Sequence, residues 1–251
     1  MTVPVHIYGV TDTSVTIPAD RTGRSKRPLR HIEGDGLRVL VSDVDADSRV
    51  LREDLMAHAH TLEAVATLGT VLPMQFGVEM PDDDTVRHEL IESRGDEIRP
   101  LLERFDGLLQ LTVSVDLIEQ EALREALRRD PDLVALRDEV RRASPQERHS
   151  AEVRLGEAIA AALDVLRAGV GDGVVDQLAP TARAVSLGEV RGALQAAEIF
   201  LLVERDRQSE VDATVTTLRE DLAPLASLRY VGPQPPYAFL DAASSGALAW
   251  A

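Results

Sequence analysis

The chain has 251 residues, of which 44% are hydrophobic and only 3% aromatic. This length supports one large or two small domains whose cores are built from Leu, Val, Ile and Ala. The formal charge of −16 argues against binding to nucleic acid or to anionic membranes, because both surfaces require clustered Lys and Arg. The absence of cysteine excludes disulfides and thiolate metal sites.

No apolar run approaches the roughly 20 residues that a helix needs to cross a bilayer. The first residues, Met1–His6, also lack the basic and apolar regions of a signal peptide. We therefore expect a soluble cytoplasmic protein that binds neither nucleic acid nor a membrane.

The first half of the chain predicts an N-terminal α+β domain over residues 1–105. A β-rich segment, Val3–Val10, precedes a hairpin whose two arms, Leu29–Glu33 and Leu37–Asp43, flank a Gly-Asp-Gly turn. A helix then ends at Gly69. Its predicted apolar stripe comprises Leu51, Leu55, His58, Leu62, Val65 and Leu68. A short strand at Thr70–Pro73 follows.

Two more helices complete this domain, one opening at Asp82–Asp84 and one containing Ile98–Phe105. Three acids suit the positive end of a helix dipole, although together with Glu79 they could also bind a cation. The basic loop Arg21–Arg30 is either a solvated loop or a docking site for an acidic partner.

The second half predicts a strand, helices, two strands, a helix and a final strand over residues 106–241. These elements are expected at Leu108–Val115, Leu117–Leu166, Thr181–Val185, Ile199–Val203, Asp206–Leu222 and Leu225–Val231. That order is typical of a split βαβ, ferredoxin-like domain, here with a helical insertion. The predicted fold class is thus α+β with two domains, the first a related α+β sandwich, and residues 242–251 form a flexible tail.

Several local signals refine the second half. Asp130-Pro131 and the capping-box pattern at Ser144–Glu147 predict helix starts. The glycine-rich run Gly169–Gly173 follows a helical pattern and is interpreted as a helix-ending loop. A second capping-box pattern, Ser186–Glu189, predicts a short helix.

A proline-rich segment near the end of the chain, here named the arm, contains Gly232, Pro233, Pro235, Pro236, Tyr237 and Phe239. Each proline fixes φ and removes a backbone donor, so we expect the arm neither to continue a sheet nor to start a helix. A stiff extended arm would press Tyr237 and Phe239 against the protein. We expect them near the turn formed by Leu72, Pro73, Phe76 and Gly77, where they would join the domains.

Motifs for catalysis or cofactor binding are not found: the sequence has no P-loop, G-x-G-x-x-G after a strand, H-E-x-x-H or G-x-S-x-G. His58 lies on the predicted apolar stripe. It is interpreted as a structural histidine of the core or of a domain interface, with a metal ligand or a base as the alternative. His60, two residues away, would point to a different helix face, so the two cannot share an ion. We expect no cofactor and no metal.

Several segments together resemble the GvpF/GvpL family of gas vesicle proteins. They are Ile7–Val10, His58 with Glu63, Gly69–Gly77, Phe200–Arg205 and Gly232–Phe239. The Leu-Pro-x-x-Phe-Gly and Gly-Pro-x-Pro-Pro-Tyr-x-Phe elements are specific as a pair. The chain departs from the family pattern at four places: Gln75 replaces Arg, Gln234 replaces Trp, Gln110 replaces Glu, and Glu198–Phe200 stands where Asn-Ala-Ala is usual.

The resemblance implies an accessory or minor structural protein of gas vesicles, the organelles of buoyancy, and not an enzyme. Such a protein would bind the major shell protein and other accessory proteins during nucleation and assembly. Its location would be the gas vesicle within the cytoplasm. Two alternatives stay open: a small-ligand-binding regulatory protein of ferredoxin-like fold, and a hydrolase that uses His58 with a carboxylate.

Overall fold

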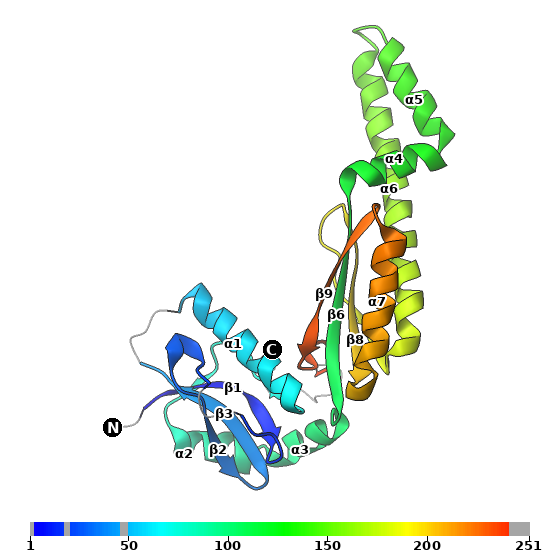
Figure 1. Cartoon of the computed structure of the whole chain (residues 1–251). Helices are drawn as coiled ribbons and strands as arrows, with labels where there is room; N and C mark the ends of the chain where they lie inside the picture. Colours follow the sequence, from blue (N-terminus) through cyan, green and yellow to red (C-terminus); the bar gives the residue numbers. More distant parts are fainter. Residues whose placement is uncertain (1–2, 18–20, 46–49, 241–251) are drawn as a thin grey trace. The chain divides into compact units, whose positions relative to one another are not determined.

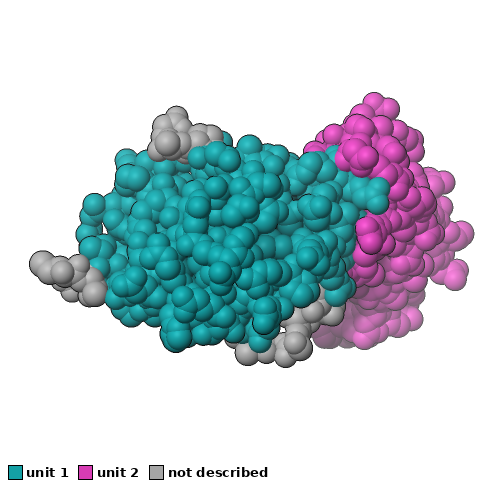
Figure 2. Space-filling view, turned by 90° about the horizontal axis from the view of Figure 1, so that it is seen from below, with its two compact units in different colours: residues 1–111, 202–205, 231–251 teal, residues 112–201, 206–230 magenta. Residues whose placement is uncertain are grey.

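The computed structural model describes residues 3–17, 21–45 and 50–240 (Figure 1). The predicted tail, 242–251, lies outside these residues. The chain divides into two compact units (Figure 2). Unit 1 comprises Met1–Leu111, Leu202–Arg205 and Val231–Ala251; unit 2 comprises Thr112–Leu201 and Asp206–Tyr230. The arm, expected within the second domain, groups with unit 1.

Unit 1 contains a sheet centred on β1 (Val5–Asp12). This strand pairs antiparallel with β3 (Leu37–Asp43), β4 (Leu72–Pro73) and β5 (Glu79–Met80), and β3 pairs with β2 (Arg30–Gly34). Seven successive residues of β1, Val5 to Thr11, are buried, as expected for a strand covered on both faces. The central position of β1 makes it the scaffold on which the rest of the unit assembles.

The predicted hairpin joins β2 to β3. Asp35 and Gly36 have φ values of 46° and 78°, and this left-handed pair is the backbone that a two-residue hairpin turn with right-handed strand twist requires. Glycine adopts it without steric cost, and aspartate tolerates it better than most residues.

Helix α1 (Arg52–Leu68) follows the sheet strands, but its buried face differs from the predicted stripe. His58, Leu62 and Val65 are buried as expected, whereas Leu51, Leu55 and Leu68 are about half exposed. The remaining buried positions are Asp54, Thr61 and Ala66. Successive residues of a helix are about 100° apart around its axis. Because Asp54 is buried instead of Leu55, the buried face of α1 is rotated away from Leu51, Leu55 and Leu68.

The acidic run at Asp82–Asp84 starts α2 (Asp83–Val86), which continues as a π-helical turn (Arg87–Glu92) before α3 (Gly95–Arg104). Oδ1 of Asp82 accepts a hydrogen bond of 2.8 Å from the Thr85 N–H. Hydrogen bonds from Thr85 hold the pKa of Asp82 below its ordinary value. Asp82 is therefore the N-cap of α2.

The second sheet has the strand order β7-β8-β6-β9. Its strands are β6 (Leu108–Leu117), β7 (Ala184–Leu187), β8 (Gln195–Glu204) and β9 (Ala226–Gln234). The Leu117 N–H donates to the Leu194 carbonyl, which joins the end of β6 to the start of β8, as in an antiparallel pair. The predicted hydrophobic strand at Ile199–Val203 is thus an inner strand of this sheet.

Three helices connect β6 to β7: α4 (Glu119–Arg129), α5 (Pro131–Arg142) and α6 (Arg148–Leu178). A fourth, α7 (Gln208–Leu222), connects β8 to β9. In Figure 1, α6 and α7 run alongside each other on the sheet, and α5 packs back against the first half of α6. The predicted start at Asp130 is present, because its Oδ1 accepts from the Asp132 N–H at 2.9 Å.

Two predictions for unit 2 are wrong. Gly169–Gly173 does not end a helix but lies inside α6. A Cβ on Gly171 would lie 2.6 Å from the Ala196 carbonyl oxygen, so glycine is needed where the helix approaches β8 closely. The short helix at Ser186–Glu189 is absent, because Ser186 and Leu187 pair in β7 and the residues that follow are not helical.

The expectation for the arm is also wrong. Strand β9 continues through Pro233 to Gln234, and a one-turn helix, α8 (Tyr237–Leu240), begins directly after Pro236. Strand β9 is an edge strand, where a proline removes no ladder hydrogen bond on its open side. Proline is equally suited to the position before a helix, since its fixed φ is helical and its missing N–H is not needed there.

Within residues 3–17, 21–45 and 50–240, every helix is either too short or too polar to cross a membrane.

Candidate functional site

Three of the segments singled out in the sequence, Ile7–Val10, His58 and Leu72–Phe76, meet in unit 1 around β1. Tyr8 lies at a β-bulge, because the register with β3 shifts between Ile7 and Gly9. Gly9 pairs with Pro73 of β4, and a Cβ at Gly9 would lie 2.6 Å from the Leu72 carbonyl oxygen. The bulge sets the direction of the Tyr8 side chain, and the missing side chain at Gly9 allows β4 to lie close to β1. Both residues are therefore needed for the packing around β1.

A pair of buried histidines forms the core of this packing. Nε2 of His6 and Nδ1 of His58 are 2.9 Å apart, and Nε2 of His58 is 3.0 Å from the Met74 carbonyl oxygen. The ring of Phe76 packs edge-on against both imidazoles, with centroids 5.5 Å away in each case. The ring of Tyr8 stacks on His58 at 5.2 Å. The Leu-Pro-x-x-Phe-Gly element therefore closes over the histidine pair.

Both imidazoles are neutral. Burial, followed by the nearby His58 and Arg24, lowers the pKa of His6 to about 3. Burial lowers the pKa of His58 to about 4, although the hydrogen bond to Met74 opposes the shift. His58 contacts a histidine and a carbonyl rather than a carboxylate, and only 4% of its surface is exposed. This geometry is that of a structural core histidine.

A polar network extends from this core to the basic loop. The Tyr8 hydroxyl is 3.0 Å from Ser42 Oγ and accepts the Arg24 N–H at 2.6 Å. Arg24 is buried and forms ion pairs with Glu79 and Asp54. Oδ1 of Asp54 accepts the Ser25 N–H at 3.1 Å. The loop is thus fastened to both β1 and α1.

The pKa of Asp54 is lowered despite its burial. Desolvation favours the neutral acid, but hydrogen bonds from the backbone of Leu51 and from Ser25, together with the charge of Arg24, outweigh it. Asp54 stays ionised and caps the start of α1, since its Oδ2 accepts the Leu51 N–H at 2.9 Å.

Two other arginines of the basic loop bind acids of the same unit. Arg27 pairs with Asp45, and Arg30 pairs with both Asp43 and Asp83. Arg27 and Arg30 are therefore already paired with acids of the chain itself, which leaves less positive charge in the loop for an acidic partner. They also engage Asp83 of the acidic run that was considered as a cation site.

The arm also contacts the core of unit 1. Tyr237 packs on a buried cluster that includes Tyr8, Leu62 and Val71, the residue before Leu72. The Ala238 N–H donates to Oε1 of Gln110 at 2.8 Å. Direct contact of Tyr237 and Phe239 with Leu72–Gly77 stays a prediction.

The individual arm residues have distinct environments. Pro235, Pro236 and Phe239 are buried, and Pro233 is half-buried. Gly232 has a φ of 149°, and a Cβ there would lie 2.5 Å from Cδ2 of Leu111. Only glycine fits this position.

A groove of about 320 Å³ runs between α1 and the start of the arm. Its lining residues are His60, Glu63, Ala64, Thr67, Val231, Gly232 and Pro233. Below it, Nη1 of Arg205 donates to the Ala66 carbonyl at 2.7 Å and so binds the last turn of α1. His60 faces this groove while His58 faces the core, as the predicted difference in helix face requires.

An apolar ridge, defined as Val50, Leu51, Leu55 and Met56, stands at the beginning of α1. The four side chains are 60%, 50%, 48% and 45% exposed. Scattered apolar residues are normal on a surface, whereas four within seven positions at one helix end make a candidate interaction site. The ridge was not found from the sequence, because its leucines were assigned to the core.

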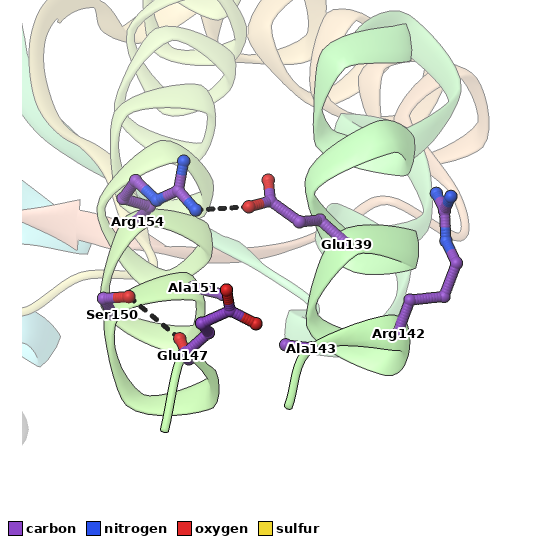
Figure 3. Close-up of a pocket in the computed structure, with 7 residues that line it drawn as sticks. All are labelled: Glu139, Arg142, Ala143, Glu147, Ser150, Ala151 and Arg154. Carbon is purple, nitrogen blue, oxygen red and sulfur yellow. Dashed lines mark hydrogen bonds and ion pairs between the residues drawn. The ribbon is translucent and has the colours of Figure 1, made fainter. Parts of the chain in front are cut away.

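Two other hollows are lined largely by charged and polar residues. One of about 420 Å³ is lined by Asp12, Ser14, Gly36, Leu37, Arg99, Leu102, Glu103 and Asp106. Another, of about 360 Å³, lies between α5 and α6, where Glu139 faces Arg154 and the Ser150 hydroxyl donates to the Glu147 carbonyl (Figure 3). Ligand pockets are mostly apolar with few polar groups, so these hollows do not favour a ligand-binding regulator. The described residues contain no group of three or more His, Asp or Glu placed to hold a metal ion.

The model of the family described as gas vesicle synthesis protein GvpL/GvpF matches residues 4–241. Gas vesicle protein F of Streptomyces sp. (strain CB03234) is 33% identical over 241 residues, which cover 94% of this chain and 99% of the relative. Gas vesicle protein F of Dolichospermum flosaquae is 21% identical over 244 residues, covering 95% and 98%.

Two crystal structures share the fold. Gas vesicle protein GvpF from Anabaena sp. PCC7120 superposes with a TM-score of 0.78 at 20% identity, covering 95% of this chain and 98% of that chain. The protein of the same name from Microcystis aeruginosa gives 0.74 at 21% identity, covering 95% and 99%. At these identities the likeness establishes the fold.

Proposed function

This chain belongs to the gas vesicle synthesis protein GvpL/GvpF family, and we propose that it is an accessory or minor structural protein that binds the major gas vesicle shell protein and other accessory proteins during vesicle nucleation and assembly. The family is one of gas vesicle proteins and not a known enzyme family. We infer that the chain acts by binding, without catalysis or cofactor, at gas vesicles in the cytoplasm.

The observation that carries this proposal is the apolar ridge at the start of α1. A hydrophobic shell subunit needs an apolar surface to bind before it assembles, and burial of exposed apolar area yields about 25 cal/mol per Å². Val50, Leu51, Leu55 and Met56 supply such a surface on a helix whose first turn is fixed by Asp54. Binding that requires no ordering of the helix costs less entropy.

The strongly acidic character of the chain supports the same role. A formal charge of −16 keeps the protein and its bound subunit soluble through repulsion between complexes, and it attracts basic residues of the shell protein. Reversing exposed acidic patches should therefore weaken capture of the shell protein. Unchanged capture would remove the electrostatic part of the proposal.

We propose further that residues 106–241 form a ferredoxin-like domain with a helical insertion, and that residues 1–105 form a related α+β domain. The support is the element order β6, α4–α6, β7, β8, α7, β9 and the strand order β7-β8-β6-β9. The insertion comprises α4, α5 and the first half of α6, whereas the second half of α6 is the crossover helix that lies beside α7 on the sheet.

A binding experiment tests the ridge directly. Purified shell protein is captured by the tagged chain, by the ridge variant L51Q/L55Q/M56Q, and by a control variant, V153Q/V165Q. The control changes two exposed apolar residues of α6, far along the sequence from the ridge. We expect the ridge variant to lose capture and the control to retain it. Equal capture by all three proteins would contradict the assignment of this surface.

A further inference from the structure

A small pocket in unit 2 lies where α6 crosses the end of β7 and the start of β8. Its volume is about 120 Å³. The walls are made of the smallest residues: Ala168 and Gly171 from α6, Ala196 and Ala197 from β8, and Gly188 after β7. The pocket exists because these positions carry no larger side chain.

The glycines of this pocket are constrained by the fold. A Cβ on Gly171 would lie 2.6 Å from the Ala196 carbonyl oxygen, and a Cβ on Gly188 would lie 3.0 Å from atoms of Glu198 and Phe200. The Gly188 N–H also donates to the Glu198 carbonyl at 2.8 Å. The helix, the strand and the loop are therefore held in close contact around the hollow, which gives it fixed walls.

The volume limits what can enter. About 120 Å³ is close to the roughly 150 Å³ of an apolar cavity that accepts one benzene-sized group. It is well below the roughly 300 Å³ of pockets that hold cofactors or drug-sized molecules. A single branched aliphatic side chain matches it. Two exposed apolar residues also line the pocket, Leu187 at 64% and Val190 at 39% exposure, which favours an aliphatic group.

The charged side chains that line the pocket are both acidic. The two charged residues that line it are Asp172, which is exposed, and Glu198, whose Oε2 accepts from Gln195 at 3.3 Å. The nearest arginine of α6 along the chain, Arg167, is bound to Asp164 and to the Gly192 carbonyl. A positive group beside the entering side chain would therefore meet carboxylates.

We propose that this pocket is a docking site for a partner polypeptide that inserts one leucine-sized side chain next to a lysine or arginine. The aliphatic group fills the hollow between Ala168 and Ala197 and covers Leu187, and the neighbouring cation pairs with Asp172. This site lies on a different unit from the apolar ridge and does not depend on the proposed role of that ridge.

The test uses a defined probe and the full chain. The blocked dipeptide N-acetyl-Leu-Arg-amide is titrated into isotope-labelled protein while backbone amide shifts are followed by NMR. We expect saturable shifts confined to residues 168–175 and 187–198, with a dissociation constant on the order of 1 mM, as suits one side chain and one exposed ion pair. N-acetyl-Leu-Glu-amide and N-acetyl-Gly-Arg-amide should each bind at least threefold more weakly.

Three variants decide whether the pocket itself binds the probe. Ala168→Phe fills the hollow from an exposed helix position and should abolish the shifts. Asp172→Lys should weaken binding about three- to tenfold. Glu157→Lys, an equal change of charge on an exposed part of the same helix some four turns away, should leave binding unchanged within twofold.

The protein spectra report folding of each variant at the same time. Absence of saturable shifts with the Leu-Arg probe would overturn the proposal, as would equal binding of the Gly-Arg probe or full binding by Ala168→Phe. Because no gas vesicle protein is used as a probe, this outcome is independent of the binding experiment on the ridge.

Discussion

Nε2 of His6 lies 2.9 Å from Nδ1 of His58, and this contact fixes the protons of both rings. The carbonyl oxygen of Met74 only accepts hydrogen bonds, so Nε2 of His58 carries a proton. Nδ1 of His58 is then the acceptor, and Nε2 of His6 donates to it. Nδ1 of His6 is left as a buried lone pair that has no hydrogen-bond partner among the described residues. A proton added there would place a charge in the core.

This arrangement predicts loss of stability in acid. The pKa values of about 3 for His6 and about 4 for His58 lie below the value of 6.5 for a free imidazole. The unfolded chain therefore binds more protons than the folded chain between pH 6.5 and 4, so stability is full above that range and falls as the pH falls through it. By pH 5 the loss should be about 2 kcal/mol for each histidine.

Urea unfolding at pH 7.5 and pH 5 measures this loss. The variant H6N/H58Q should be less stable at pH 7.5, because it disrupts the core, but its stability should depend less on pH. His60→Gln, which alters a groove residue outside the core, is the matched control and should keep the full pH dependence. A double variant with the same pH slope as the parent would show that other groups cause the acid sensitivity.

Two glycines of α6 are expected to respond in opposite ways to substitution by alanine. Gly171→Ala places a Cβ against the Ala196 carbonyl and should destabilise the chain by about 1–3 kcal/mol, the usual cost of overpacking. Gly173→Ala meets nothing within 4 Å and should stabilise it by about 0.5–1 kcal/mol, since alanine is the better helix former. Thermal unfolding distinguishes them. Equal effects of the two substitutions would mean that α6 does not approach β8 closely at Gly171.

The attachment of the arm depends on Gly232. Substitution by alanine should cost about 1–3 kcal/mol, because the residue has a φ of 149° and its Cβ would overlap Leu111. Hydrogen exchange should show faster exchange of the Ala238 amide, which loses its hold on Gln110. Gly36→Ala, at a φ of 78° in open space, should cost about 1 kcal/mol and leave that amide protected. Unchanged protection in Gly232→Ala would contradict the close packing of the arm.

The basic loop provides a comparison of buried and exposed ion pairs. Arg24→Met removes a cation that is 2% exposed and should cost about 3–5 kcal/mol, because Asp54 and Glu79 lose their partner. Arg27→Met breaks the exposed pair with Asp45 and should cost less than about 1 kcal/mol. Chemical denaturation gives both values. Similar small costs would show that Arg24 does not hold the loop to the core.

Local sequence patterns sufficed for many elements of the fold. The Asp35-Gly36 turn, the cap at Asp130 and the apolar spacing of α7 each reflect a preference that acts within a few residues. Gly171 shows where such reasoning fails. A glycine in a helical pattern predicts a helix end by local preference, whereas its actual role is set by Ala196, a residue distant in sequence.

The histidine core illustrates the same limit for the site. His58 was singled out from its helix position, but His6 carried no spacing signal because its partner lies 52 positions away. The mostly apolar run Val3–Val10 could have indicated from the sequence that His6 is internal. The apolar ridge was missed for a different reason: nothing in the sequence shows that Asp54, held by Ser25 and Arg24, takes the buried position next to Leu55.

We propose that this chain is required for gas vesicle assembly through the ridge on α1. The most direct measurement is electron microscopy of cells that lack the gene, complemented with the parent chain, with L51Q/L55Q/M56Q, or with V153Q/V165Q at matched expression. We expect vesicles with the parent and with the α6 control, and none or few in the deletion strain and with the ridge variant. Normal vesicles in the deletion strain, or with the ridge variant, would contradict it.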